Sequence, residues 1–116
     1  MFNKLSGEGY ISNLKDTEQK TLVYGDKTLM VEFKFKKGSV LPKHSHPYEQ
    51  TGYLISGHMI LSIDGKTYDV HPGDSWCILD GLQHSAEAIE DTIAVEVFAP
   101  VREDYLPQKT YEEMTK

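Results

Sequence analysis

Residues 38–50 read Gly-Ser-Val-Leu-Pro-Lys-His-Ser-His-Pro-Tyr-Glu-Gln, and they constrain the fold more than any other stretch of the chain. His44 and His46 are two residues apart, so on an extended strand both imidazoles point to the same face. Gln50 has the same parity and adds an amide oxygen on that face, whereas Glu49 points away. Two imidazoles and an amide oxygen suit a divalent Zn, Ni, Fe or Mn ion better than Ca or Mg, which prefer several oxygens. A His-x-His pair also occurs in proteins that bind no metal. The rest of the sequence is therefore needed to choose between a metal site and a histidine pair without one.

The sequence on both sides of this stretch is dominated by apolar residues at every second position. Between residues 28 and 36 four apolar side chains alternate with mostly polar ones, which predicts a half-buried strand. Further strand-like runs occur at 50–55, 58–63, 66–70, 75–79, 85–89 and 92–98. Asp64-Gly65, between two of these runs, is a strong hairpin signal. Many short, evenly spaced strands predict an all-β fold, an antiparallel sandwich or barrel.

We expect a single domain over residues 1–116, which is enough chain for one modest core. Its parts are a barrel core at about 28–98, an N-terminal strand arm at 1–25 and a C-terminal tail at 99–116. A helical signal occurs only in the tail, where Thr110 and Glu113 could form a capping box for a short helix over 111–116.

Composition excludes several classes of function. The formal net charge is −6, from 12 basic and 18 acidic residues, which argues against nucleic acid as a partner. No apolar run approaches the ~20 residues of a membrane span, and the chain begins without a secretory leader pattern. The one cysteine, Cys77, lies in the apolar run 76–79, and we expect its thiol to be buried. These features predict a cytoplasmic protein with neither a nucleic-acid nor a membrane partner.

The stretch 38–50, followed by Gly57, resembles the first motif of the cupin family: a glycine, five residues, His-x-His, a further ligand and a glycine. Residues 72–84, Pro-Gly-Asp-Ser-Trp-Cys-Ile-Leu-Asp-Gly-Leu-Gln-His, resemble the second motif, which ends on His84. The resemblance covers about residues 30–98. It implies an antiparallel double-stranded β-helix, or jelly roll, that binds one divalent transition metal ion. The implied ligands are His44, His46, Gln50 and His84.

Gln50 stands where the family pattern usually has glutamate. Three neutral imidazoles and a neutral amide would leave a bound ion with its full charge, and so make it a stronger Lewis acid than one that also binds a carboxylate. The set also lacks the two-histidine, one-carboxylate arrangement of many non-haem iron oxygenases, which weakens an oxygenase reading without excluding it.

A second group of candidate residues lies near the end of the chain. Glu96 and Phe98 share a face of the last predicted strand, and Arg102 follows just beyond it. Arg102 is the only arginine, and its planar guanidinium suits the bidentate binding of a carboxylate. The alternative is a surface arginine that pairs with Glu103 or Asp104.

This ending resembles that of the small cupins that linearise unsaturated uronates in pectin and alginate breakdown. The resemblance implies Glu96 and Arg102 as catalytic residues and Phe98 as substrate-binding, although that family has aspartate where this chain has Glu96. Tyr48 is a further candidate for the wall of the substrate site. In this scheme Arg102 holds the carboxylate of the substrate and Glu96 transfers a proton.

Three hypotheses for the function stay open. The first is a metal-dependent isomerase or lyase that acts on a small carboxylated, uronate-like substrate. The second is a metal-dependent oxygenase for a small organic molecule, and the third is a non-catalytic binding or sensing barrel.

We also expect a homodimer. Open sheet edges need to be covered, and the strand-like residues 10–14 and 21–24 have no obvious place in a single barrel. The cupin resemblance likewise implies dimers.

Overall fold

The computed structural model describes residues 1–107, so the short helix expected over 111–116 lies outside the described residues. The elements are β1 (Thr17–Tyr24), β2 (Leu29–Phe35), β3 (Val40–His44), β4 (Glu49–Ser56), β5 (Met59–Ile63), β6 (Lys66–Val70), β7 (Ser75–Ile78), β8 (His84–Ala88), β9 (Thr92–Ala99) and the 3-10 helix η1 (Glu103–Tyr105). Among residues 1–107 no helix is long and apolar enough to cross a membrane.

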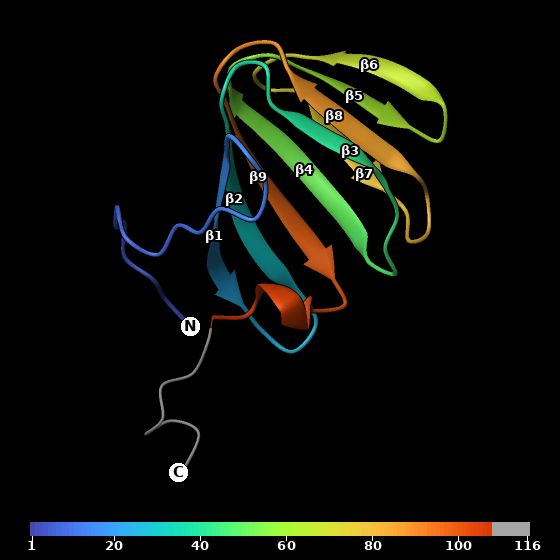
Figure 1. The fold of residues 1–116 in the computed structure, drawn as a ribbon. Helices are drawn as coiled ribbons and strands as arrows, with labels where there is room; N and C mark the ends of the chain where they lie inside the picture. Colours follow the sequence, from blue (N-terminus) through green and yellow to red (C-terminus); the bar gives the residue numbers. More distant parts are fainter. Residues whose placement is uncertain (108–116) are drawn as a thin grey trace.

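The strands form two antiparallel sheets that face each other (Figure 1). One sheet has the order β1-β2-β9-β4-β7 and the other the order β3-β8-β5-β6. The chain passes repeatedly from one sheet to the other, as the figure shows for the segments that follow β2, β4 and β8. The predicted all-β antiparallel fold is confirmed.

The hairpin between β5 and β6 has the turn that its sequence predicts. Asp64 and Gly65 have φ angles of 48° and 82°, and Ile63 pairs with Lys66 on either side of them. Two successive residues with positive φ make a type I′ turn, whose twist matches that of the flanking strands.

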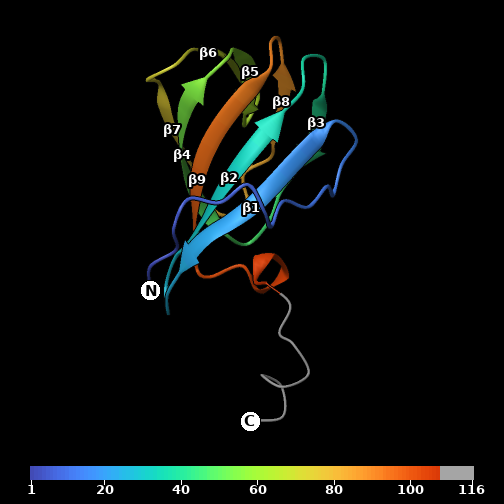
Figure 2. The same cartoon turned by 90° about the vertical axis from the view of Figure 1, so that its left-hand side faces the viewer.

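The N-terminal arm is in part a regular strand of the five-stranded sheet. β1 pairs with β2 along its whole length and forms the edge of the sheet, as Figure 2 shows from the side. Before β1 the chain doubles back, and the backbones of Ile11 and Gln19 exchange two hydrogen bonds of 2.9 and 2.8 Å. This contact places Asn13 and Leu14, just before β1, at the mouth of the sandwich, the open end where His44, His46 and His84 lie.

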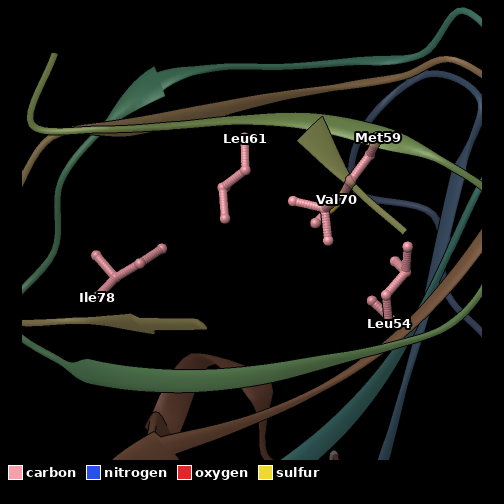
Figure 3. Packing of buried hydrophobic residues seen from close by; sticks show 6 residues of the cluster. Leu54, Met59, Leu61, Val70 and Ile78 are labelled. Atoms are coloured by element: carbon pink, nitrogen blue, oxygen red, sulfur yellow. The ribbon is translucent and has the colours of Figure 1, made fainter. Parts of the chain in front are cut away.

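Two apolar clusters fill the space between the sheets. In the first, Met59, Leu61 and Val70 point from one sheet toward Leu54 and Ile78 on the other (Figure 3). Each such buried side chain contributes about 1.5–3 kcal/mol to stability.

The second cluster lies at the opposite end of the sandwich. It contains Leu29, Val31 and Phe98, with Tyr48 and Tyr105 packed against them. The functional site described below is built on this second cluster.

Cys77 corrects one prediction from the sequence, because its thiol is exposed and not buried. β7 is an edge strand with only one face against the core, so alternate side chains point outward. Ile78 takes the inward position and leaves Cys77 on the outside.

Candidate metal centre and adjoining cavity

Three histidines from two parts of the chain come together at the mouth of the sandwich. His44 ends β3 and His84 begins β8, and the two are direct partners across these strands. His46 lies just past β3, in the connection to β4, and not on a strand as the sequence suggested. The ring of His84 lies 4.1 Å from that of His44 and 4.9 Å from that of His46, centre to centre. One ligand atom from each histidine lies within 4.8 Å of the other two.

The backbone fixes which nitrogen each histidine offers. Nδ1 of His44 donates to the carbonyl of Pro42 at 2.8 Å, and Nδ1 of His84 donates to that of Leu82 at 2.9 Å. Nδ1 of His46 lies 3.1 Å from another carbonyl, that of Tyr48. A carbonyl oxygen can only accept a hydrogen bond, so each Nδ1 carries the proton. Each neutral ring therefore keeps a lone pair on Nε2, the form that binds a metal.

The surroundings also favour neutral imidazoles. Burial lowers the pKa of His46, and the charge of Arg102 lowers it further. Burial likewise lowers the pKa of His84, against the opposing effect of its hydrogen bond to the backbone at Leu82. Both rings are thus held in the form that binds a cation.

Gln50 lies beside the three histidines as expected, but not through strand parity, because β3 ends at His44 and Gln50 belongs to β4 of the other sheet. It is 6% exposed, whereas its neighbour Glu49 is exposed to solvent. Its Nε2 donates to Oε2 of Glu96, which leaves the amide oxygen Oε1 for another partner. This hydrogen bond joins the candidate metal ligand directly to the candidate catalytic carboxylate.

The buried polar atoms of the site fit a bound cation. Nε2 of His46, Nε2 of His84 and Oε1 of Gln50 are buried and have no hydrogen-bond partner within residues 1–107. Buried acceptors without partners are costly, and these belong to the ligand types that divalent transition metals prefer. Together with His44, they could hold one such ion.

Glu96 is buried at the base of the site. Burial raises the pKa of its carboxyl to about 7, against the opposing effects of its hydrogen bond with Gln50, the Trp76 indole and the charge of Arg102. Trp76 reaches this position because Gly52 lies opposite it on β4, where a Cβ would come within 2.1 Å of the indole ring. No motif in the sequence marks Trp76, although a glycine in a strand signals the close approach of another group.

Arg102 immediately precedes η1, and the turn of η1 brings Tyr105 back over the side chain of Arg102. The backbone N–H of Tyr105 donates to the carbonyl of Arg102 at 3.0 Å, and the ring of Tyr105 lies 3.8 Å from the guanidinium carbon. The rings of Tyr48 and Phe98 lie 5.0 Å from the same atom. The side chain is 13% exposed and forms an ion pair with Asp104. The predicted alternative of pairing with Asp104 is therefore seen, but at a mostly buried position.

A cavity of about 410 Å³ brings the two groups of residues together. Its lining includes the three histidines, Gln50, Glu96, Phe98 and Arg102. Tyr48 does not line it, and packs instead against His46 and Arg102.

The cavity is also lined by residues that the sequence did not single out for this role. They are Asp104 and Tyr105 of η1 and the N-terminal residues Asn13, Leu14, Thr17 and Gln19. The sequence carries no signal for the N-terminal group, because its position depends on the pairing of β1.

Comparisons with known proteins agree with this architecture. Residues 31–100 match the family model for a cupin domain. The chain is 25% identical over 91 residues to the pectin degradation protein KdgF of Dickeya dadantii, and the match covers 77% of this chain and 83% of that protein. The solved structure of KdgF from Halomonas sp. is similar with a TM-score of 0.82 and 26% identity, covering 85% of this chain and 92% of that one. An RmlC-like cupin from Shewanella frigidimarina has the same fold, with a TM-score of 0.86, 23% identity and coverage of 90% and 95%. The match over residues 31–100 shows that this chain belongs to the cupin family.

Proposed function

We propose that this cupin is a metal-dependent isomerase that opens the ring of a small unsaturated uronate. The observation that carries the proposal is the single cavity that contains the histidine cluster, Glu96 and Arg102. Metal ligands, a carboxyl group and an arginine within one small cavity match a small substrate that carries an acid group. The relatives named KdgF, one of them described as a pectin degradation protein, support the same class of substrate.

His44, His46, Gln50 and His84 would hold the metal ion. A divalent ion at this position supplies Lewis-acid stabilisation to an oxygen of the substrate. The protein positions its ligands before binding, since the three Nδ1 atoms are hydrogen-bonded to the backbone and Gln50 is hydrogen-bonded to Glu96.

Arg102 would bind the carboxylate of the substrate, and Phe98 would pack against the sugar ring. Ring opening of the cyclic hemiacetal requires the anomeric hydroxyl to lose a proton while the bond between the anomeric carbon and the ring oxygen breaks. The ring oxygen leaves as an enolate, which becomes a ketone by taking up a proton on carbon. Glu96 would accept the first proton and supply the second, so the reaction is a net isomerisation that needs no co-reactant.

The burial of Glu96 supports this role. A carboxyl with a pKa near neutrality can both accept and release a proton in the working range of the cell. The lining of the cavity favours catalysis over a simple sensing barrel, because a binding site for a neutral or apolar ligand would need neither Glu96 nor Arg102.

A direct test is to follow the ultraviolet absorbance of an unsaturated galacturonate monomer mixed with the metal-loaded protein. We expect the absorbance to fall faster than in buffer and expect Glu96→Gln to lower kcat by about 100-fold, the usual range for loss of a proton-transfer group. Glu103→Gln is a suitable control, because Glu103 neighbours Arg102 in the sequence but does not line the cavity. A wild-type rate equal to that of buffer with every one of Zn, Ni, Fe and Mn would contradict the proposal.

A further inference from the structure

Two kinds of contact hold Arg102: aromatic rings that pack around its guanidinium, and hydrogen bonds to Asp104. The rings fix where the guanidinium lies, and the hydrogen bonds fix how it is turned. The aromatic rings of Tyr48, Phe98 and Tyr105 pack around the guanidinium, at 3.8 Å in the case of Tyr105. Such contacts with ring faces attract the cation but are weakly directional within the guanidinium plane. The rings alone therefore do not determine which edge of the guanidinium faces the cavity.

Asp104 supplies the missing direction. Nε of Arg102 donates to Oδ1 of Asp104 at 3.2 Å, and Nη2 donates to Oδ2 at 2.7 Å. This paired contact occupies one edge of the guanidinium and leaves the edge formed by Nη1 and Nη2. Within residues 1–107, Nη1 has no hydrogen-bond partner, and Nη2 has none besides Asp104. The remaining edge is itself a two-donor fork that fits a carboxylate.

The charges in the site explain why such a contact is needed. Arg102 lines the same cavity as the candidate metal ligands His44, His46 and His84. A metal ion bound there would repel the guanidinium. Asp104, whose side chain is 53% exposed, lies on the solvent side of Arg102 and also lines the cavity. Its negative charge offsets the repulsion and keeps the arginine at its mostly buried position.

The contact between Arg102 and Asp104 lies within one short turn, and contacts with β1 hold this turn in place. Asp104 is two residues after Arg102, within η1. The hydroxyl of Thr21 donates to the carbonyl of Tyr105 at 2.5 Å, which ties this turn to β1. Asp104 is thus held on a short, anchored segment, and its geometry does not depend on a substrate.

We propose that Asp104 is a positioning residue that turns Arg102 so that its Nη1 and Nη2 edge binds the carboxylate of the substrate. The proposal rests on the function proposed above, and it assigns a role to a residue that does not itself touch the reacting atoms.

The first test uses the single arginine of the chain and needs no substrate. The Nε–H of Arg102 gives one arginine signal in a proton–nitrogen NMR spectrum, and the hydrogen bond to Asp104 should slow its exchange with solvent. We expect exchange at least about tenfold faster in Asp104→Asn than in the wild type, as expected for the loss of a charge-assisted hydrogen bond. Glu103→Gln should leave the rate unchanged. Equal exchange in the wild type and Asp104→Asn would overturn the proposal.

The second test measures turnover of an unsaturated galacturonate monomer by the metal-loaded protein. Asp104→Asn should raise KM about tenfold and change kcat by less than about threefold, because binding of the carboxylate is lost while proton transfer by Glu96 is retained. Asp104→Glu should recover part of the affinity, since it restores the charge. An unchanged KM in Asp104→Asn would refute the role of Asp104 while leaving the proposed function intact. An inactive wild type with an intact, Asp104-dependent arginine signal would refute the proposed function and, with it, the role in substrate binding.

Discussion

Replacing Glu96 by glutamine should remove a pH-dependent contribution to the stability of the metal-free protein. Burial raises the pKa of Glu96 from 4.5 to about 7 in the folded state. Because the folded-state pKa is the higher one, folding favours the protonated carboxyl. The contribution to stability is complete below the unfolded pKa and is lost as the pH rises through the folded pKa.

The size of the effect follows from the two pKa values. The difference between 4.5 and about 7 corresponds to a total of about 3 kcal/mol, of which about 2 kcal/mol is lost between pH 5 and pH 7. His46 and His84 act in the opposite direction, because their lowered pKa values make the folded protein less stable as the pH falls. The wild-type pH profile alone is therefore a mixture of effects.

Comparison of the two proteins isolates Glu96. Urea denaturation of wild type and Glu96→Gln, both dialysed against a chelator, gives a free energy of unfolding at each pH. The wild type should lose about 2 kcal/mol relative to the variant between pH 5 and pH 7, since the histidines contribute equally to both. A difference between the two proteins that stays constant over this range would refute the account of Glu96 as a buried carboxyl that titrates near neutrality.

Three further predictions concern the site and the assembly. Gly52→Ala should destabilise the protein by about 1–3 kcal/mol in thermal or urea unfolding, because its Cβ would meet Trp76 at 2.1 Å. Gly25→Ala, where nothing lies within 4 Å, is the control, and equal effects of the two changes would contradict this packing. Arg102→Lys should raise KM for the unsaturated uronate about tenfold or more despite keeping the charge, because lysine lacks the planar fork. An unchanged KM would argue against carboxylate binding by Arg102. Light scattering should give a mass twice the 13.2 kDa of the chain, and a monomer at high concentration would exclude the proposed homodimer.

The strands and the turn chemistry could be predicted from the sequence because they depend on local patterns. Alternation of apolar residues gave β2 and β9, and Asp64-Gly65 placed the hairpin between β5 and β6. Parity favoured Gln50 over Glu49, and Gln50 is indeed buried beside the histidines while Glu49 is exposed. The reason is different, because residues 45–48 are not a strand and the inward face of β4 selects Gln50.

The remaining features depend on contacts between distant segments, which carry no local pattern. The pairing of β1 with β2 brings Asn13 and Gln19 to the cavity, and no motif marks either residue. An apolar run around Cys77 does not reveal that β7 has one face in solvent. The sequence offered Glu103 and Asp104 equally as partners for Arg102, and only the turn of η1 selects Asp104.

We propose that ring opening of the uronate requires one metal ion, bound by His44, His46, Gln50 and His84. The most direct measurement titrates the metal-depleted protein with a divalent ion while the absorbance of the unsaturated uronate is followed. We expect the rate to rise linearly and to reach a plateau at one equivalent of metal per chain. In His84→Ala we expect neither metal uptake nor a rate above that of buffer. A full rate in the metal-depleted wild type, or an unaltered titration in His84→Ala, would contradict the role of the metal ion.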